Sequence, residues 1–347
     1  MANATYGQRL ARRLQASWLH RDWLSWLLID VSYVFRALVA LRRWLYAQDL
    51  LVGGHPGVPV IVVGNVVAGG GGKTPVVIEI VRHLRQSGWQ VGVVSRGYGR
   101  LGTDTLEVTA QTPVAQSGDE PALIHHALQA PVFVAKKRLD AARALLATHP
   151  HIDIIVCDDG LQHLALERDI EVCVFDDRGV GNGSMLPAGP LREPWPRTVS
   201  AQITSLVLHT GKLDTGFRLQ RRLADYALRQ DGSRVPLANL VGHHASALAG
   251  IAVPEAFFAM LRSAGITITE TIGLPDHYDF NSCPRIIHKE ETLICTEKDA
   301  RKLWPSHPQA LAVPLELNIE PDFFTALDTA VRAALSLRAE ATSIPPP

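Results

Sequence analysis

Cysteine is scarce in this chain of 347 residues, and neither sign of charge is in excess. The four cysteines lie far apart and form no C-x-x-C pair, which argues against a disulfide framework and favours a reducing, cytoplasmic compartment. Lysine plus arginine equals aspartate plus glutamate at 34 each, so the chain as a whole has no basic field that would attract nucleic acid. We therefore expect a globular protein without a nucleic-acid partner.

Long uncharged apolar runs are also absent from the N-terminal segment, residues 1–50. No uncharged run in this segment reaches the roughly 18 residues that a membrane-spanning helix needs, because it is interrupted by Asp22, Asp30 and Arg36. The segment nevertheless holds four of the seven tryptophans, and seven arginines against three aspartates. This mixture at helical spacing predicts a helix in the membrane interface; the alternative is a helix packed on its own domain, with solvated arginines. The expected anchors are Trp18, Trp23, Trp26 and Trp44, and the expected headgroup contacts are Arg9, Arg12, Arg13, Arg42 and Arg43.

A glycine-rich segment, VGNVVAGGGGKTP, follows an expected buried strand and leads into an expected helix. Glycines let backbone N–H groups turn toward a phosphate, and the helix N-terminus adds positive potential. Lys73 is placed to reach the β and γ phosphates, and the Thr74 hydroxyl to ligate Mg²⁺. Val67 replaces the first glycine of G-x-x-x-x-G-K-[ST], which weakens the match but keeps the cradle; a turn without ligand is the alternative. The expected nucleotide-binding residues are Val67, Ala68, Gly69, Gly70, Gly71, Gly72, Lys73 and Thr74.

Paired aspartates end two further apolar runs. A Mg²⁺-nucleotide site needs a carboxylate at the end of a neighbouring buried strand. Asp158 and Asp159 fit this place, and we favour them over the rival pair at 176–177 because Gly160 allows a sharp turn into the site. The guanine signature N-K-x-D is missing, since TEKD at 296–299 has the wrong spacing, so ATP is expected rather than GTP.

Apolar runs alternate with helical patterns from residue 58 onward, which predicts an α/β fold: a P-loop NTPase-like, mostly parallel sheet with crossover helices. The expected strands are 58–64, 89–95, 131–135, 152–159, 170–177 and 203–209, the last closing this sheet, with helices at 74–87, 120–128 and 138–148. Residues 211–245 resemble a connector, and strand and helix patterns after them end in a strand at 310–317 and a helix at 323–337. We expect four regions: a membrane-associating helix region (1–50), a P-loop core (51–210), a smaller C-terminal α/β domain (211–337) and a tail (338–347).

A family resemblance joins these motifs. The segments VGNVVAGGGGKTP, SRGYGR, GDEP, DDGLQH, RDIEVCVFDDRGVGNGSMLPAGPLREP, AGIAVP, PDHYDF and TEKDARKL occur in the order seen in tetraacyldisaccharide 4′-kinases, the lipid A 4′-kinases of Gram-negative bacteria. The resemblance covers about residues 58–303 and departs from the usual G-G-T-G-K-T at Gly71, which replaces the threonine.

What the resemblance implies is specific. It implies ATP- and Mg²⁺-dependent phosphorylation of the 4′-hydroxyl of a tetraacylated glucosamine disaccharide 1-phosphate, the lipid A precursor. The reaction is expected at the cytoplasmic face of the inner membrane, in a cleft between a P-loop domain and the smaller domain. No obligate protein partner is expected.

The resemblance also implies roles for single residues. Asp119 of GDEP resembles the family's catalytic carboxylate, and His277 of PDHYDF the histidine that works with it. A sugar hydroxyl has a pKa far above 7, so a positioned carboxylate must accept its proton. The expected catalytic residues are thus Asp119, His277, Lys73 and Glu193 of LREP, and the metal-side residues are Thr74, Asp158 and Asp159.

Four further residues are candidates for binding the substrate's 1-phosphate or sugar: Arg138, Gln162, His163 and Arg192. Arginine suits this task because its guanidinium holds phosphate with two hydrogen bonds. For Arg138 a solvated helix start is the alternative.

Two other classes of function compete with the kinase. A P-loop switch ATPase or GTPase of the metallochaperone or partition type normally carries clustered Cys or His, or a lysine where Ala68 stands. A membrane-bound binding module with a vestigial loop would not need Lys73, Thr74 and the aspartate pair intact.

Overall fold

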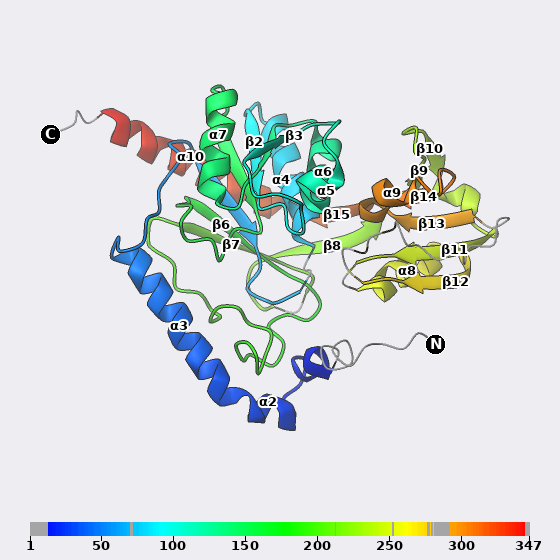
Figure 1. Cartoon of the computed structure of the whole chain (residues 1–347), viewed down its shortest axis with the longest axis horizontal. Coiled ribbons are helices and arrows are strands. Elements are labelled where there is room, and N and C mark those ends of the chain that lie inside the picture. The colour runs from blue at the N-terminus through cyan, green and yellow to red at the C-terminus, as the bar shows by residue number, and fades with distance from the viewer. Residues whose placement is uncertain are drawn as a thin grey trace.

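Two β-sheets organise the chain in the computed structural model, which describes residues 13–69, 72–211, 213–251, 253–275, 278, 280 and 292–343. The larger sheet has the order β15-β8-β7-β6-β1-β5-β2-β4-β3, and the smaller one β10-β9-β14-β13-β11-β12 (Figure 1). The strands of the larger sheet are β1 (Val60–Gly64), β2 (Val91–Ser95), β3 (Leu106–Val108), β4 (Val132–Val134), β5 (Ile154–Asp158), β6 (Ile170–Phe175), β7 (Thr204–His209), β8 (Phe217–Leu223) and β15 (Leu315–Ile319). Those of the smaller sheet are β9 (Tyr226–Leu228), β10 (Arg234–Pro236), β11 (His244–Ala249), β12 (Thr267–Gly273), β13 (Thr292–Thr296) and β14 (Leu311–Val313).

Helices cover both faces of the larger sheet. They are α4 (Lys73–Gln86), α5 (Val114–Ser117), α6 (Asp119–Leu128), α7 (Arg138–Thr148) and α10 (Pro321–Ser343). Strand β1 shows why two faces need cover: Ile61 and Val63 point into the core under α4, α6 and α10, whereas Val60 and Val62 point into the core under α7. A strand buried on both sides consists of apolar residues throughout, which explains the continuous run VIVVG.

The parallel register sets the position of the candidate site. Strand β1 pairs in parallel with β5 on one side and β6 on the other, and Val63 lies opposite Asp158. The carboxyl ends of these strands therefore meet at one edge, where the glycine loop leaves β1 and the first aspartate pair leaves β5. Ligands of open parallel sheets bind at this edge.

The smaller sheet carries helices α8 (Pro254–Ser263) and α9 (Glu297–Leu303) and a 3₁₀ turn, η1 (Leu237–Leu240). Phe257, Phe258 and Leu261 of α8 are buried in its core. This confirms the mixed α/β fold with a second, smaller unit that the sequence predicts.

Three expectations about chain organisation were wrong. Strand β7 does not close the larger sheet, because β8 pairs with it in parallel and β15 pairs antiparallel with β8. The segment 211–245 is not a plain connector, since it contains strands β8, β9 and β10 and a 3₁₀ turn, η1. The expected strand 310–317 is two strands, β14 and β15, which lie in different sheets on either side of Pro314.

These pairings bear on the division into domains. Strands β8 and β15 run between the two sheets (Figure 1), and Phe323, Leu327 and Val331 of α10 lie in the core of the larger one. Residues 217–223 and 315–343 thus belong structurally with the larger sheet, whereas the sequence analysis grouped 211–337 as one C-terminal domain.

The N-terminal segment forms a helical arm beside the larger unit. Helices α2 (Trp23–Leu27) and α3 (Ile29–Ala47) follow each other almost directly, and α3 lies at the margin of the molecule next to the long loop after β6 (Figure 1). Within the described residues, no helix is long and apolar enough to cross a membrane.

Candidate active site

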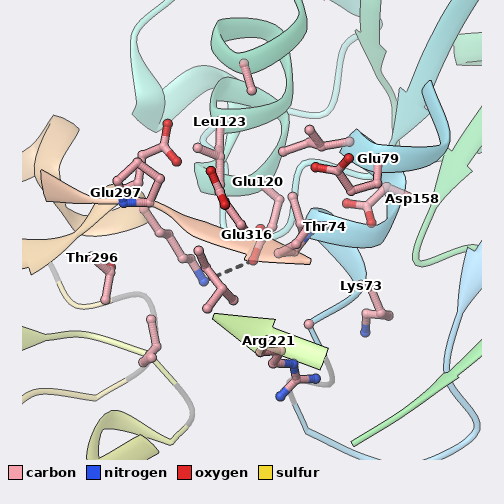
Figure 2. Close-up of a pocket in the computed structure, with 18 of the residues that line it drawn as sticks. Lys73, Thr74, Glu79, Glu120, Leu123, Asp158, Arg221, Thr296, Glu297 and Glu316 are labelled. Atoms are coloured by element: carbon pink, nitrogen blue, oxygen red, sulfur yellow. Dashed lines mark hydrogen bonds and ion pairs between the residues drawn. The ribbon is translucent and has the colours of Figure 1, made fainter. Parts of the chain in front are cut away.

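A cavity of about 1000 Å³ lies between the larger and the smaller unit. The glycine loop, the end of β5 and strand β8 line it from the larger unit, and α8 and the start of α9 line it from the smaller one. Figure 2 shows Lys73, Thr74 and Asp158 on one side, with Thr296 and Glu297 across from them. The cleft between the two units that the resemblance implies is therefore present.

Lys73 opens helix α4 and points toward the end of β5. Its Nζ lies 2.9 Å from Asp159 Oδ1 and 3.4 Å from Asn65 Oδ1. Gly72 precedes it with φ of 69°, a left-handed conformation that glycine adopts without strain. The loop geometry thus holds the ammonium beside the aspartate pair, at the N-terminus of a helix.

The two aspartates have opposite electrostatic environments. Burial raises the pKa of Asp158 from 3.8 to about 7, and the neighbouring charges of Asp159 and Glu120 add to the effect. Burial also opposes ionisation of Asp159, but the ammonium of Lys73 and the guanidinium groups of Arg192 and Arg138 together outweigh it and lower the pKa of that carboxyl. Asp159 is therefore the ionised partner of Lys73 in the ligand-free protein.

The chemistry of this edge fits Mg²⁺. Asp158 Oδ1 is buried at the cavity and has no hydrogen-bond partner among the described residues. Thr74 lines the same cavity. Magnesium is usually held by one or two carboxylates together with substrate phosphates, and a buried carboxylate oxygen without a hydrogen-bond donor fits such a ligand.

The rival pair at 176–177 lies on the same edge but in another environment. Asp176 lines the cavity, yet Arg178 binds it through Nη2 at 2.7 Å, and this guanidinium lowers the pKa of Asp176 against the effect of burial. Arg178 also donates to the carbonyl of Ala68 at 3.2 Å. The geometry therefore favours Asp158 and Asp159 for the metal side.

Sequence comparisons identify the family. The family model described as tetraacyldisaccharide-1-P 4′-kinase matches residues 24–332. The chain belongs to this family. It is 56% identical to the tetraacyldisaccharide 4′-kinase of Acidovorax ebreus, over 92% of this chain and 94% of that one, and 56% identical to that of a Polaromonas species, over 92% and 96%.

A solved structure agrees. The "apo" form of LpxK from Aquifex aeolicus in complex with ATP superposes with a TM-score of 0.75 at 27% identity, covering 90% of this chain and 99% of the other. The expectations of a kinase and of ATP as its nucleotide are confirmed, and a switch ATPase or GTPase is not favoured.

The predicted substrate-binding residues of this kinase family member converge on the aspartate pair. Arg138 is buried rather than solvated, and its Nη2 donates to the carbonyl of Asp159 at 2.7 Å. Arg192 Nη1 lies 3.8 Å from Asp159 Oδ1 and 3.3 Å from Gln162 Oε1. Both arginines line the cavity, where a phosphate would meet them.

His163 has a different environment from that of a phosphate-binding cation. Burial, followed by the nearby charges of Arg138 and Arg168, lowers its pKa from 6.5 to about 4. Its Nε2 accepts the backbone N–H of Arg138 at 3.2 Å, at the start of α7. A neutral His163 is thus placed to orient Arg138.

Glu193 is the centre of a buried polar network. It accepts hydrogen bonds from Gln162 Nε2 at 2.8 Å, Arg43 Nη1 at 3.0 Å and Arg197 Nε at 3.2 Å. Glu193 is not among the described residues that line the cavity. These contacts suit a residue that orients Gln162 better than one that touches substrate.

The remaining predicted residues divide into three groups. Asp119 lies at the first turn of α6, with its carboxylate 2.7 Å from Lys302 Nζ. The loop after β6 holds Val67 and Ala68. Val67 forms an isolated antiparallel β-bridge with Leu191, and the Ala68 N–H donates to the carbonyl of Pro190. His277, Gly70 and Gly71 lie outside the described residues.

Sequence reasoning missed two residues at the site. Asn65 is buried at the end of β1 and contacts Lys73, a position that the motif VGN marks as a strand end. Arg221 of β8 lines the cavity, and a Cβ on Gly72 would lie 2.7 Å from its Nη2. The alternation in FRLQRRL would have placed Arg221 on a strand, but its charges suggested a connector.

The raised pKa of Asp158 predicts an unusual stability effect. The folded-state pKa lies above the unfolded value, so stability is lost as pH rises from about 4 to about 7. Asp158→Asn should stabilise the metal- and nucleotide-free protein by at most about 4 kcal/mol at pH 8, and by less at pH 5. Urea unfolding at both pH values measures this.

Asp159→Asn is the matched control, with the opposite sign. The pKa of Asp159 is lowered, so its ionised form stabilises the fold at pH 8 and the substitution should destabilise it. Stabilisation by both substitutions, or by neither, would contradict the assigned environments.

Proposed function

We propose that this chain transfers the γ-phosphoryl group of ATP to the 4′-hydroxyl of a tetraacylated glucosamine disaccharide 1-phosphate, the lipid A precursor, with Mg²⁺, at the cytoplasmic face of the inner membrane of a Gram-negative bacterium. The observation that carries the proposal is the meeting of Lys73 with Asp158 and Asp159 at one sheet edge, in a chain of this family. Nothing in the proposed reaction requires a protein partner.

Several polar groups at the cleft, and Asp119 beside the cavity-lining Glu120, have a place in this reaction. Thr74, Asp158 and Asp159 would hold Mg²⁺, which neutralises charge on the phosphates when bound. Lys73 would leave Asp159 for the β and γ phosphates, since a phosphate offers it more charge. Arg138 and Arg192 would hold the phosphates or the sugar phosphate from the opposite side. Asp119 would accept the proton of the 4′-hydroxyl.

The membrane location rests on the helical arm. The fully buried residues of α2 and α3 are serines, Ser25 and Ser32. Phe35 and Val39 pack partly on the core of the larger unit, but most large apolar residues of these helices are exposed to solvent. Ser32 Oγ donates to the carbonyl of Met185 at 2.9 Å and accepts from the Ala188 N–H at 3.0 Å. Exposed apolar residues of the arm are Trp23, Trp26, Leu27, Val31, Tyr33, Val34, Leu38, Leu41 and Trp44. An apolar face this long suits the membrane interface.

The arm's arginines fall into two classes. Arg13 and Arg21 stack over Trp23 and Trp26, with 5.4 and 5.9 Å to the ring centroids, and Arg42 lies over Tyr46. Arginine over an interfacial aromatic is placed to meet anionic headgroups. Arg43 instead turns inward to Glu193, so it is not a headgroup contact of this arrangement; Arg9 and Arg12 lie outside the described residues.

A transfer assay tests the function. The protein is incubated with γ-labelled ATP, Mg²⁺ and the tetraacylated disaccharide 1-phosphate in detergent. Label in a lipid product that carries phosphate at the 4′ position supports the proposal. Release of free phosphate alone, with no labelled lipid, would contradict it.

Lys73→Ala should lower lipid phosphorylation in this assay by at least about 100-fold, because the ammonium stabilises charge on the transferring phosphoryl group. Lys136→Ala, at an exposed lysine outside the cavity, is the matched control and should retain activity. Near-normal turnover of a folded Lys73→Ala protein would rule out the phosphate site.

Asp119→Asn should lower kcat by about 10²–10⁴-fold and leave ATP binding nearly unchanged, because it removes the proton acceptor but keeps its shape. Asp322→Asn is the control, an exposed aspartate in the first turn of α10. Equilibrium binding of a non-hydrolysable ATP analogue separates the two quantities. A normal kcat in Asp119→Asn would exclude Asp119 as the general base.

The combined change Trp26→Ser, Val34→Ser and Leu38→Ser should weaken sedimentation with anionic vesicles and raise KM for membrane-embedded substrate. These three side chains are exposed and carry none of the arm's inward contacts, so ATP binding and folding should be unchanged. Val241→Ser, at an exposed valine of the smaller unit, is the control. Full sedimentation of the triple variant would move the membrane contact to another surface.

A further inference from the structure

The motif TEKDARKL, which the proposed chemistry leaves unused, comprises the N-cap Thr296 and the whole of α9. Thr296 caps this helix: its Oγ1 accepts the N–H of Asp299 at 3.3 Å and donates to Asp299 Oδ2 at 2.6 Å. Asp299 Oδ2 also accepts the N–H of Gly250 at 2.8 Å, where a Cβ would approach Asp299 Oδ1 to 2.8 Å. These contacts fix α9 rigidly to the end of β11 in the smaller unit.

Three basic side chains of α9 extend from the smaller unit and contact the first turn of α6 in the larger unit. Lys302 Nζ lies 2.7 Å from Asp119 Oδ2, and Lys298 Nζ lies 3.1 Å from Glu120 Oε1. Arg301 Nη1 donates to the carbonyl of Ala122 at 3.2 Å. Their spacing of three and four residues places all three on one helix face.

Lys302 makes the most specific of these contacts. The same Nζ donates to the carbonyl of Tyr278 at 3.1 Å, so it joins the Asp119 carboxylate to the backbone of the smaller unit. The Asp119 side chain is only 8% exposed and that of Lys302 18%, so solvent screens this pair weakly. Neither Lys302 nor Asp119 is among the described residues that line the cavity, but their neighbours in contact, Lys298 and Glu120, are.

We propose that Lys302 is a positioning residue that fixes the orientation of the Asp119 carboxylate across the junction of the two units. The inference rests on the proposed role of Asp119 as proton acceptor. An ammonium with two acceptors from different units holds the carboxylate in one rotamer and ties it to closure of the cleft. A base misplaced by about 1 Å loses on the order of 10²-fold in rate.

Lys302→Met tests the proposal, since it keeps the length and apolar stem of the side chain and removes the charge. The full-length protein, assayed at a temperature where the variant is folded, should show kcat lowered by about 10–100-fold with KM for ATP close to wild type. Lys302→Arg, which keeps the charge, should recover part of kcat. Arg262→Met is the matched control and should retain activity, because it removes an exposed ion pair of α8 that does not reach the larger unit.

A double-mutant cycle separates positioning from a structural contribution. Adding Lys302→Met to Asp119→Asn should cause no further loss of kcat if the lysine acts through this carboxylate. Fully additive losses, or a lowered thermal midpoint with wild-type kcat in Lys302→Met, would overturn the proposal. If Lys302→Met does not fold, Lys302→Arg decides, because its different reach should still lower kcat several-fold, and a wild-type kcat would refute positioning.

The role of Asp119 is tested apart from this inference. Loss of activity in Asp119→Asn, together with normal kcat in Lys302→Met, would refute the positioning role and leave the base in place. Normal kcat in Asp119→Asn would refute the base itself, and with it the inference. Wild-type protein that transfers no label to lipid would instead refute the proposed function.

Discussion

The ion pair between Lys73 and Asp159 depends on β1 and β5 being parallel neighbours, and the candidate site is built around it. The glycine loop continues β1 and the aspartate pair continues β5, so their ends reach the same edge within one strand spacing of each other. Burial and the neighbouring charge of Asp159 disfavour ionisation of Asp158, and either a proton or a bound cation removes this penalty. In the ligand-free protein the ammonium of Lys73 provides positive charge at this edge, and the proposed Mg²⁺ would add more.

The sequence predicted the parts of the fold that rest on local pattern. Continuous apolar runs marked the central strands, and the order strand, glycine loop, Lys-Thr, helix marked the edge where the candidate phosphate site lies. Strand β8 was not predicted, because FRLQRRL is partly exposed and its charged residues alternate with inward-facing ones. The pairing of Lys302 with Asp119 could not be predicted, since its partners are 183 residues apart and meet only through the packing of two units. Likewise, the motif around His163 gave no sign that burial would keep it neutral.

The path of the chain explains why the cleft lies where it does. Strands β8 and β15 leave the larger sheet toward the smaller one, so two antiparallel strands connect the walls of the cavity (Figure 1). Arg221 of β8 therefore reaches the glycine loop from the connection itself. The α9–α6 contacts join the two units a second time, through ion pairs and a hydrogen bond. Such ion pairs can break without disturbing either core, so the cleft can open at these contacts.

The helical arm and the phosphate site share one hydrogen-bonded network. Arg43 of α3 binds Glu193, Glu193 accepts from Gln162, and Gln162 accepts from Arg192 beside Asp159. The arm's inner side meets this network and the loop after β6 through polar groups and packs Phe35 and Val39 on the core, whereas most of its large apolar residues lie on the outer side. If that outer side lies in the membrane interface as proposed, the network fixes the height and tilt of the cleft above the lipid. A 4′-hydroxyl that protrudes a set distance from the bilayer can then meet a base that is itself held in place.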